Sequence, residues 1–227
     1  MVNKSKASKV RRISTIACAA VLAVIWSIPP VKAYLTDIAD DMDNKFTIAL
    51  DSTSKVVEKF PDTVPDIDAA HNIASYEKAV QVINTGYIDE YVRLRLDFSD
   101  SDIEAKTQFS YDGKNFYSIN EYRNHLPQGW IYNAQDGYYY YTKILETGDW
   151  ESVKNTLQYD EATGQYYYKT GQNILATNMI TVPLIRYVKT VFDSPDDMRS
   201  YALYAYSESC PFYFGNDYSG AWNNYLN

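Results

Sequence analysis

The fold is decided by residues 78–98, which run KAVQVINTGYIDEYVRLRLDF. From residue 91 onward, apolar side chains alternate with tyrosine, arginine and aspartate. Successive side chains of a strand face opposite sides of its sheet, so this alternation predicts a strand with one buried face. The mostly apolar residues 79–83 lead into a turn signal in which the glycine is free to take a positive φ. The stretch therefore predicts two antiparallel strands joined around that turn. The residues expected to set the turn and the core are Asn84, Gly86, Val92, Leu94 and Leu96.

Three further hairpins are predicted by turn residues between runs rich in aromatic and β-branched side chains. They span residues 108–117 with a turn at Asp112-Gly113, residues 130–145 with a turn at Asp136-Gly137, and residues 157–169 with a turn at 161–164. Strands are also expected at 46–50, 180–192 and 201–206, short helical turns within 65–76 or 119–123, and the longest loop at 51–75. Strands at such short spacing predict an antiparallel all-β sandwich.

The composition fits one domain and limits its partners. The chain has 227 residues, 46% of them hydrophobic, which is enough for a substantial core. Its 23 tyrosines, against 8 phenylalanines and 4 tryptophans, suit half-buried β surfaces and contact faces. The net charge of −8 argues against a nucleic-acid partner, because such binding depends on basic residues that neutralise phosphates.

Residues 1–33 have the pattern of a secretory signal peptide. Five basic residues and no acidic residue precede an apolar run from Ile13 to Ile28, and Ala33 then occupies the position expected before a cleavage site. The run has sixteen residues, fewer than the roughly 20 that a membrane-spanning helix needs. We predict cleavage between Ala33 and Tyr34, and hence a secreted protein.

Cleavage changes the charge and the cysteine content. The mature chain would hold 15 basic and 29 acidic residues, a net charge of −14, with Cys210 as its one cysteine. Without an internal disulfide, its stability must come from the core, and a buried thiol is expected. The expected organisation is a signal helix over residues 1–33, a jelly-roll-like or Ig-like β-sandwich over 34–210, and an aromatic tail over 211–227 that is packed on the sandwich or appended to it.

Several motifs, in this order, resemble the TasA/camelysin family of exported proteins of Gram-positive bacteria. The resemblance runs from about residue 10 to residue 222. Its motifs are the post-signal segment Ala33-Tyr34-Leu35-Thr36-Asp37 with Asn44-Lys45-Phe46-Thr47, the strand-turn-strand of 80–86 and 91–96, the segment from Trp130 through residues 136–145 to Gly148, and the closing Tyr201–Ala205 with Ala221-Trp222. The loop 51–75, the hairpin at 156–170 and the tail 210–227 depart from the family pattern.

The resemblance implies a structural protein of the cell surface or biofilm matrix, processed by a dedicated signal peptidase. It also implies assembly into fibres by strand exchange, either as a homopolymer or with a sister matrix subunit. In this chain the exchanged segment would be residues 34–50, with Phe46, Ile48 and Leu50 as anchors. The alternative from the residues alone is that 46–50 forms the first strand of its own sandwich.

A second function class is a cell-surface adhesin that binds cell-wall polysaccharide. Alternate rings of the run 138–141 face opposite sides of a strand, so some are expected in the core and some in solvent. The side chains expected to form a surface aromatic contact are Trp130, Tyr139 and Tyr141. Ordinary cross-strand packing is the alternative for the same residues.

The sequence does not favour an enzyme. Camelysins carry a metalloprotease label, but the two histidines, His71 and His125, are 54 residues apart and lie in no zinc-binding motif. The chain has no Gly-x-Ser-x-Gly and no phosphate-binding glycine loop. No cofactor is therefore expected. The acidic cluster after the clearest strand lacks EF-hand spacing and is expected to be a solvated loop, with calcium binding as the alternative. That cluster consists of Asp97, Asp100, Asp102 and Glu104.

Overall fold

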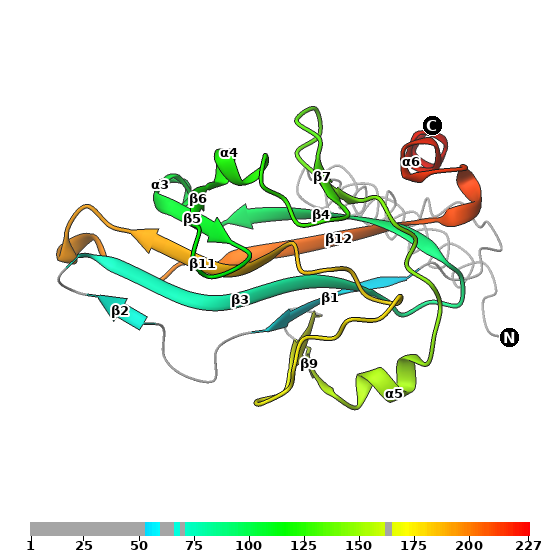
Figure 1. The fold of residues 1–227 in the computed structure, drawn as a ribbon, viewed down its shortest axis with the longest axis horizontal. Coiled ribbons are helices and arrows are strands. Elements are labelled where there is room, and N and C mark those ends of the chain that lie inside the picture. The colour runs from blue at the N-terminus through cyan, green and yellow to red at the C-terminus, as the bar shows by residue number, and fades with distance from the viewer. Residues whose placement is uncertain (1–52, 60–65, 69–70, 162–164) are drawn as a thin grey trace, which may run out of the picture. The chain divides into compact units, whose positions relative to one another are not determined.

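A computed structural model describes residues 53–59, 66–68, 71–161 and 165–227, and these form two β-sheets packed face to face (Figure 1). The predicted signal peptide with its cleavage site at Ala33 and Tyr34 lies outside the described residues, as do Phe46, Ile48 and Leu50. No helix among the described residues is long and apolar enough to cross a membrane.

The larger sheet, sheet A, has the strand order β6-β5-β11-β3-β1-β10-β9, and β2 also pairs with β3. Most neighbours are antiparallel, but β1 and β10 are parallel, with Val57 beside Tyr166, so the all-antiparallel prediction is wrong for this pair. The strands are β1 (Ser54–Lys59), β2 (Asp66–Asp68), β3 (Ile73–Asn84), β5 (Thr107–Ser110), β6 (Tyr117–Ser118), β9 (Leu157–Asp160), β10 (Gln165–Tyr168) and β11 (Ile185–Val191).

The smaller sheet, sheet B, has the order β12-β4-β8-β7 and is antiparallel throughout. Its strands are β4 (Glu90–Phe98), β7 (Trp130–Tyr132), β8 (Tyr139–Tyr141) and β12 (Leu203–Pro211). Figure 1 shows β4 and β12 as one layer above β11, β3 and β1. Short helices connect or cap the strands: α3 (Ser101–Lys106), α4 (Ile119–Tyr122), α5 (Trp150–Lys154), η1 (Pro195–Asp197), η2 (Phe212–Phe214) and α6 (Tyr218–Leu226).

The two strands predicted within residues 78–98 exist, but they do not pair with each other. β3 belongs to sheet A and β4 to sheet B, so the turn between them crosses from one layer to the other. Buried Asn84 holds this crossing: its side-chain amide donates to the carbonyl groups of Ile88 (2.8 Å) and Leu145 (3.1 Å) and accepts from the Gly86 amide (2.8 Å). Gly86 is not among the described glycines with a positive φ, so its predicted backbone role is also wrong.

The other three predicted hairpins are confirmed, as β5–β6, β7–β8 and β9–β10. The Asp-Gly turns place Gly113 and Gly137 at φ of 73° and 79°, a region that glycine adopts without steric cost. The strands expected at 180–192 and 201–206 are present as β11 and the longer β12, and the helical turn at 119–123 is present as α4.

Residues 51–75 are not one long loop, and 65–76 contains no helix among its described residues, because β1, β2 and the start of β3 lie there. Sequence alternation does not reveal β1 because Val56 and Val57 are both buried, one on each face. The outer face of sheet A is covered by a second apolar cluster that includes Leu157, Tyr168 and Met179. A strand buried on both faces loses the period-two pattern.

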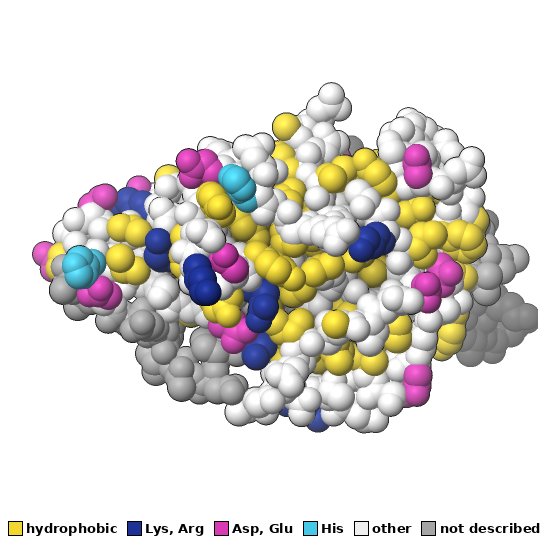
Figure 2. Space-filling model, viewed as in Figure 1, with side chains coloured by type: hydrophobic (Ala, Val, Ile, Leu, Met, Phe, Trp, Pro, Cys, Tyr) yellow, Lys and Arg dark blue, Asp and Glu magenta, His cyan; other side chains and the backbone are white. Residues whose placement is uncertain are grey.

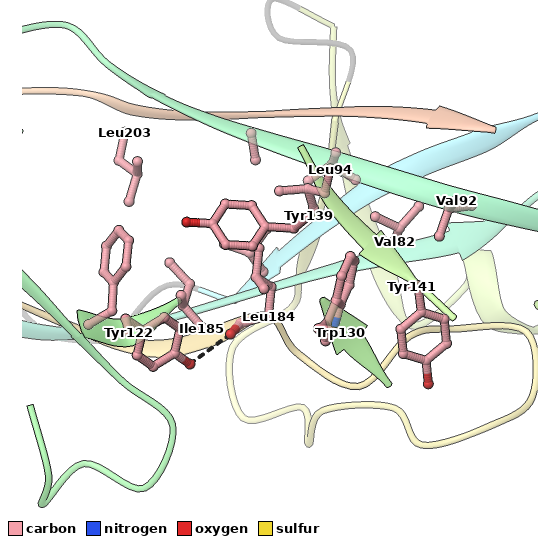
Figure 3. Close-up of a cluster of buried hydrophobic side chains, with 14 of the residues drawn as sticks. Val82, Val92, Leu94, Tyr122, Trp130, Tyr139, Tyr141, Leu184, Ile185 and Leu203 are labelled. Atoms are coloured by element: carbon pink, nitrogen blue, oxygen red, sulfur yellow. Dashed lines mark hydrogen bonds between the residues drawn. The ribbon is translucent and has the colours of Figure 1, made fainter. Parts of the chain in front are cut away.

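The main core fills the space between the sheets (Figure 3). Val92 and Leu94 are fully buried there, and Leu96 packs against the same cluster, as predicted. Trp130, Tyr139 and Tyr141 also belong to this core, with only 4%, 3% and 5% of their surface exposed. Their predicted role as a surface contact is therefore wrong. β8 lies between β4 and β7 rather than at an edge, and its inward rings fill the sandwich.

Candidate functional site at the edge and outer face of sheet B

Strand β12 forms one end of sheet B and is the longest end strand of either sheet. It has nine residues, compared with three in β7, four in β9 and two in β6. Among the described strands of its sheet, β12 pairs only with β4. An edge of this length offers a row of backbone groups with which another strand can pair.

The register shows which groups of β12 point away from β4. The Ser99 amide donates to the Ala202 carbonyl (3.0 Å) and the Phe212 amide donates to the Asp89 carbonyl (3.1 Å). The backbone N–H and C=O groups of the even-numbered residues of β12 therefore point toward β4. In an antiparallel pair these groups alternate, so Leu203, Ala205 and Ser207 direct their N–H and C=O groups toward the side of β12 on which no other described strand of sheet B lies.

Two contacts from sheet A reach this edge. Gln165 of β10 donates its side-chain amide to the Ala205 carbonyl at 2.8 Å. The Ser54 hydroxyl of β1 donates to the Ser207 hydroxyl at 3.3 Å. Side chains thus occupy part of the edge where a strand would otherwise continue the sheet, one way in which proteins limit uncontrolled edge pairing.

The outer face of β12 carries two exposed tyrosines. Tyr204 and Tyr206 are 46% and 52% exposed, and their ring centres are 6.3 Å apart. They lie opposite Asp97 and Arg95 of β4, which form an ion pair at 3.0 Å. The alternation along β12 indicates this exposure, because Leu203 and Ala205 are buried and the tyrosine that follows each of them is exposed.

Next to this open face, Arg93 of β4 is the centre of a polar and aromatic cluster. Its guanidinium group pairs with Glu208, contacts Asp136 at 3.6 Å and donates to the Tyr140 hydroxyl at 2.9 Å. Tyr138 donates to Glu208 at 2.6 Å. Burial and then this hydrogen bond raise the pKa of Tyr138 above its ordinary value, so its hydroxyl remains a donor at neutral pH.

The C-terminal tail covers the rest of the outer face. Trp222 and Ala221 of α6 are buried against Tyr91, Tyr140 and Cys210, so this tail is packed on the sandwich. Cys210 is a free, fully buried thiol, and burial raises its pKa to about 12. A thiol that remains protonated at neutral pH is a poor nucleophile.

The acidic residues considered for calcium have other partners. Asp100 caps α3 and pairs with Arg199 at 2.7 Å, and Asp102 pairs with Lys106 at 3.0 Å and Arg199 at 3.1 Å. The cationic partners hold the pKa of both carboxyl groups below the ordinary value. Asp97 pairs with Arg95 instead, and Glu104 is exposed on α3. No group of three or more potential metal ligands occurs among the described residues.

The two histidines have separate local contacts. His71 lies 2.7 Å from Asp68 in an exposed pair, and His125 stacks on Tyr117 with a distance of 4.0 Å between ring centres. Comparison of the chain with family models, curated proteins and solved structures finds no match.

Proposed function

We propose that this chain is an exported structural protein of the cell surface or biofilm matrix of a Gram-positive bacterium. It assembles into fibres when the N-terminal segment of one copy, residues 34–50, adds to the β12 edge of the next. The long end strand β12 is the observation that carries this proposal. The resemblance to TasA/camelysin proteins supports the same function and a jelly-roll-like or Ig-like connectivity.

The proposed addition uses the backbone groups of Leu203, Ala205 and Ser207, and the incoming strand displaces the Gln165 amide from the Ala205 carbonyl. Main-chain hydrogen bonds give affinity in such a complex, and alternate side chains of the incoming strand give register. Phe46, Ile48 and Leu50 have the required spacing of two residues. On the inner side of an extended sheet B they would lie beside the core residues Leu203 and Ala205.

Cleavage after Ala33 has a defined role in this proposal. It releases the segment that begins at Tyr34 from the membrane-directed signal, so that the segment can reach a neighbouring copy. The dedicated signal peptidase is thus a partner whose action precedes assembly. Purified mature protein is expected to polymerise, whereas precursor that still carries residues 1–33 is expected to stay unassembled.

A pair of substitutions at Ser207 tests the edge. Ser207→Pro removes a backbone N–H that faces away from β4, and proline is tolerated at such edge positions. Ser207→Ala removes only the hydroxyl and is the matched control. Electron microscopy is expected to show fibres with the alanine variant and few or none with the proline variant. Equal fibre formation by both folded variants would exclude this edge.

Deletion of residues 34–44 tests the donor segment independently. The shortened mature protein is expected to fold, by circular dichroism, and to remain monomeric. Undiminished fibres would contradict the proposal. If residues 46–50 instead complete their own sandwich, the complete mature protein, residues 34–227, would remain monomeric at every concentration, which size-exclusion chromatography reveals.

A further inference from the structure

A groove of about 570 Å³ lies beside the segment 173–183 that connects β10 to β11. Its wall includes Lys59 at the end of β1, Tyr111 after β5, Tyr141 of β8 and Arg186 of β11. In Figure 1 this connection, drawn in yellow, crosses in front of β3. The volume falls within the range of roughly 300–1,000 Å³ that is typical of ligand pockets.

A buried hydrogen-bond network holds this connection in place. Gln81 of β3 is fully buried, and its amide donates to the carbonyl groups of Leu175 (3.1 Å) and Thr181 (2.6 Å). The Tyr168 hydroxyl donates to Gln81 (2.7 Å) and accepts from the Leu175 amide (2.9 Å). The groove is therefore built on fixed backbone, which lowers the conformational entropy that the protein loses when a ligand binds.

The groove is positively charged in an otherwise acidic protein. Lys59 and Arg186 are the charged side chains among its described lining residues, which include no aspartate or glutamate. The Glu77 carboxylate lies 3.6 Å from Lys59 and 3.9 Å from Arg186, so one negative charge is shared by two cations. The buried Nε of Arg186 has no hydrogen-bond partner within the described part of the chain. In Figure 2, Lys and Arg side chains, with Asp and Glu side chains among them, lie beside a band of hydrophobic side chains.

Aromatic and amide groups complete the lining. Tyr111 is 37% exposed, and the Arg186 guanidinium lies 5.9 Å from the centre of its ring. The Tyr141 hydroxyl lies 3.5 Å from the Val182 amide nitrogen, and in Figure 3 it points away from the other labelled core side chains. Asn173 and Asn178 add exposed carboxamides, groups that both donate and accept hydrogen bonds, and the Asn178 amide also donates to Glu146 at 3.1 Å.

We propose that this groove binds a carboxylated sugar unit of an acidic polysaccharide. The carboxylate accepts charge-assisted hydrogen bonds from Lys59 and Arg186, because Glu77 stays 3.6 Å and 3.9 Å from these cations, beyond hydrogen-bond distance. The sugar ring packs on Tyr111, and its hydroxyl groups bond to Asn173 and Asn178. A phosphate would use the two cations but would leave the aromatic and amide lining without a role.

Titration calorimetry with trigalacturonic acid tests the proposal, and the methyl ester of the same trisaccharide is the uncharged comparison. Wild-type protein is expected to bind the acid and to bind the ester at least about tenfold more weakly. Arg186→Gln and Lys59→Gln are each expected to weaken binding of the acid by about tenfold. Lys143→Gln removes the same charge at an exposed site outside the groove and is expected to leave affinity within about twofold. Thermal unfolding establishes that each variant is folded.

Three outcomes would overturn the assignment: equal affinity for acid and ester, unchanged binding by folded Arg186→Gln and Lys59→Gln, or binding of inorganic polyphosphate in place of the saccharide. Tyr111→Ala is expected to weaken binding of the saccharide and to leave the calorimetric signal with free acetate unchanged. This comparison separates recognition of the sugar ring from attraction of a simple anion. The groove does not include β12, so these variants are expected to form fibres normally. Failure of this proposal is therefore distinguishable from failure of the assembly proposal.

Discussion

The guanidinium carbon of Arg93 lies 4.6 Å from the centre of the Trp222 ring, which joins the C-terminal helix to the outer face of sheet B. Tyr138 lies on the same guanidinium group at 4.0 Å. Stacking of this kind, added to burial of a large apolar ring, stabilises a contact by more than its area alone. The tail of this protein is thus an integral layer of the sandwich, although its sequence does not predict where it packs.

Trp222→Ala is expected to lower the free energy of unfolding by about 3–5 kcal/mol, because it removes a buried indole. The same change is expected to expose Cys210, which α6 covers, to a thiol reagent under native conditions. Urea denaturation and the rate of thiol modification measure the two effects. Trp222→Phe keeps a ring over Arg93 and is expected to lose less stability. A Trp222→Ala variant whose thiol stays unreactive would show that the helix is held by other contacts.

The buried ion pair between Glu58 and Lys78 gives a second prediction. The two side chains are 2.9 Å apart, are only 3% and 4% exposed, and face the interior of the sandwich. Burial is the largest influence on both: it raises the pKa of Glu58 and lowers that of Lys78, against the attraction between them. Removal of both charges as Glu58→Leu with Lys78→Met is expected to leave stability unchanged or to raise it by about 1–4 kcal/mol.

Removal of Lys78 alone is expected to cost about 3–5 kcal/mol, because it leaves a buried carboxyl without its partner. In that variant the folded-state pKa of Glu58 lies above its unfolded value. Stability is then fully present below the unfolded pKa and falls as the pH rises from about 4 through the folded pKa. Urea unfolding at several pH values would measure this dependence. A Lys78→Met variant with stability independent of pH would contradict the assignment of the pair.

Gln81→Leu tests the network that holds the groove. It leaves the Leu175 and Thr181 carbonyl groups and the Tyr168 hydroxyl without their buried partner. Each such loss costs about 1–3 kcal/mol. Hydrogen exchange of residues 173–181 is expected to accelerate, while exchange of β4 and β12 stays unchanged. Equal acceleration throughout the chain would indicate general destabilisation rather than local release of the connection.

The turn after β5 predicts a local pH dependence. Asp112 accepts hydrogen bonds from the Asn115 and Lys114 amides, both at 2.8 Å, and these lower the pKa of its carboxyl well below the ordinary value. A lowered folded-state pKa contributes stability above the unfolded pKa of about 3.9, and this contribution is lost as the pH falls through the folded value. A carboxyl-carbon NMR titration is expected to show a midpoint clearly below 3.9. A midpoint at the ordinary value would exclude these hydrogen bonds in solution.

Local patterns predicted most of the strands, because hairpins such as β5–β6 and β7–β8 are specified by their own turn residues. Pairing between distant segments was not predictable. Nothing near Asn84 indicates that β3 and β4 belong to different sheets, since that depends on β11 and β12, which lie about a hundred residues further along the chain. β1 was missed for a related reason: residues 165–168 pair beside it, and a separate cluster covers its outer face.

The surface aromatic contact was assigned to the wrong strand because sequence gives alternation but not position within a sheet. The run containing Tyr139 and Tyr141 is central and covered on both faces, one of them by the tail. Tyr204 and Tyr206 show the same alternation on a strand that lies at the edge, where alternate rings do remain exposed. The groove could not be predicted, because Lys59, Tyr111 and Arg186 come from three separate strands or turns.

Amide hydrogen exchange on β12, compared between monomer and fibre, tests the assembly account most directly. The N–H groups of Leu203, Ala205 and Ser207 face away from β4 and are expected to become strongly protected on assembly. Those of Tyr204 and Tyr206 face β4 and are expected to change little, so they serve as controls within the same strand. Fibres in which Leu203, Ala205 and Ser207 exchange as fast as in the monomer would contradict strand addition at this edge.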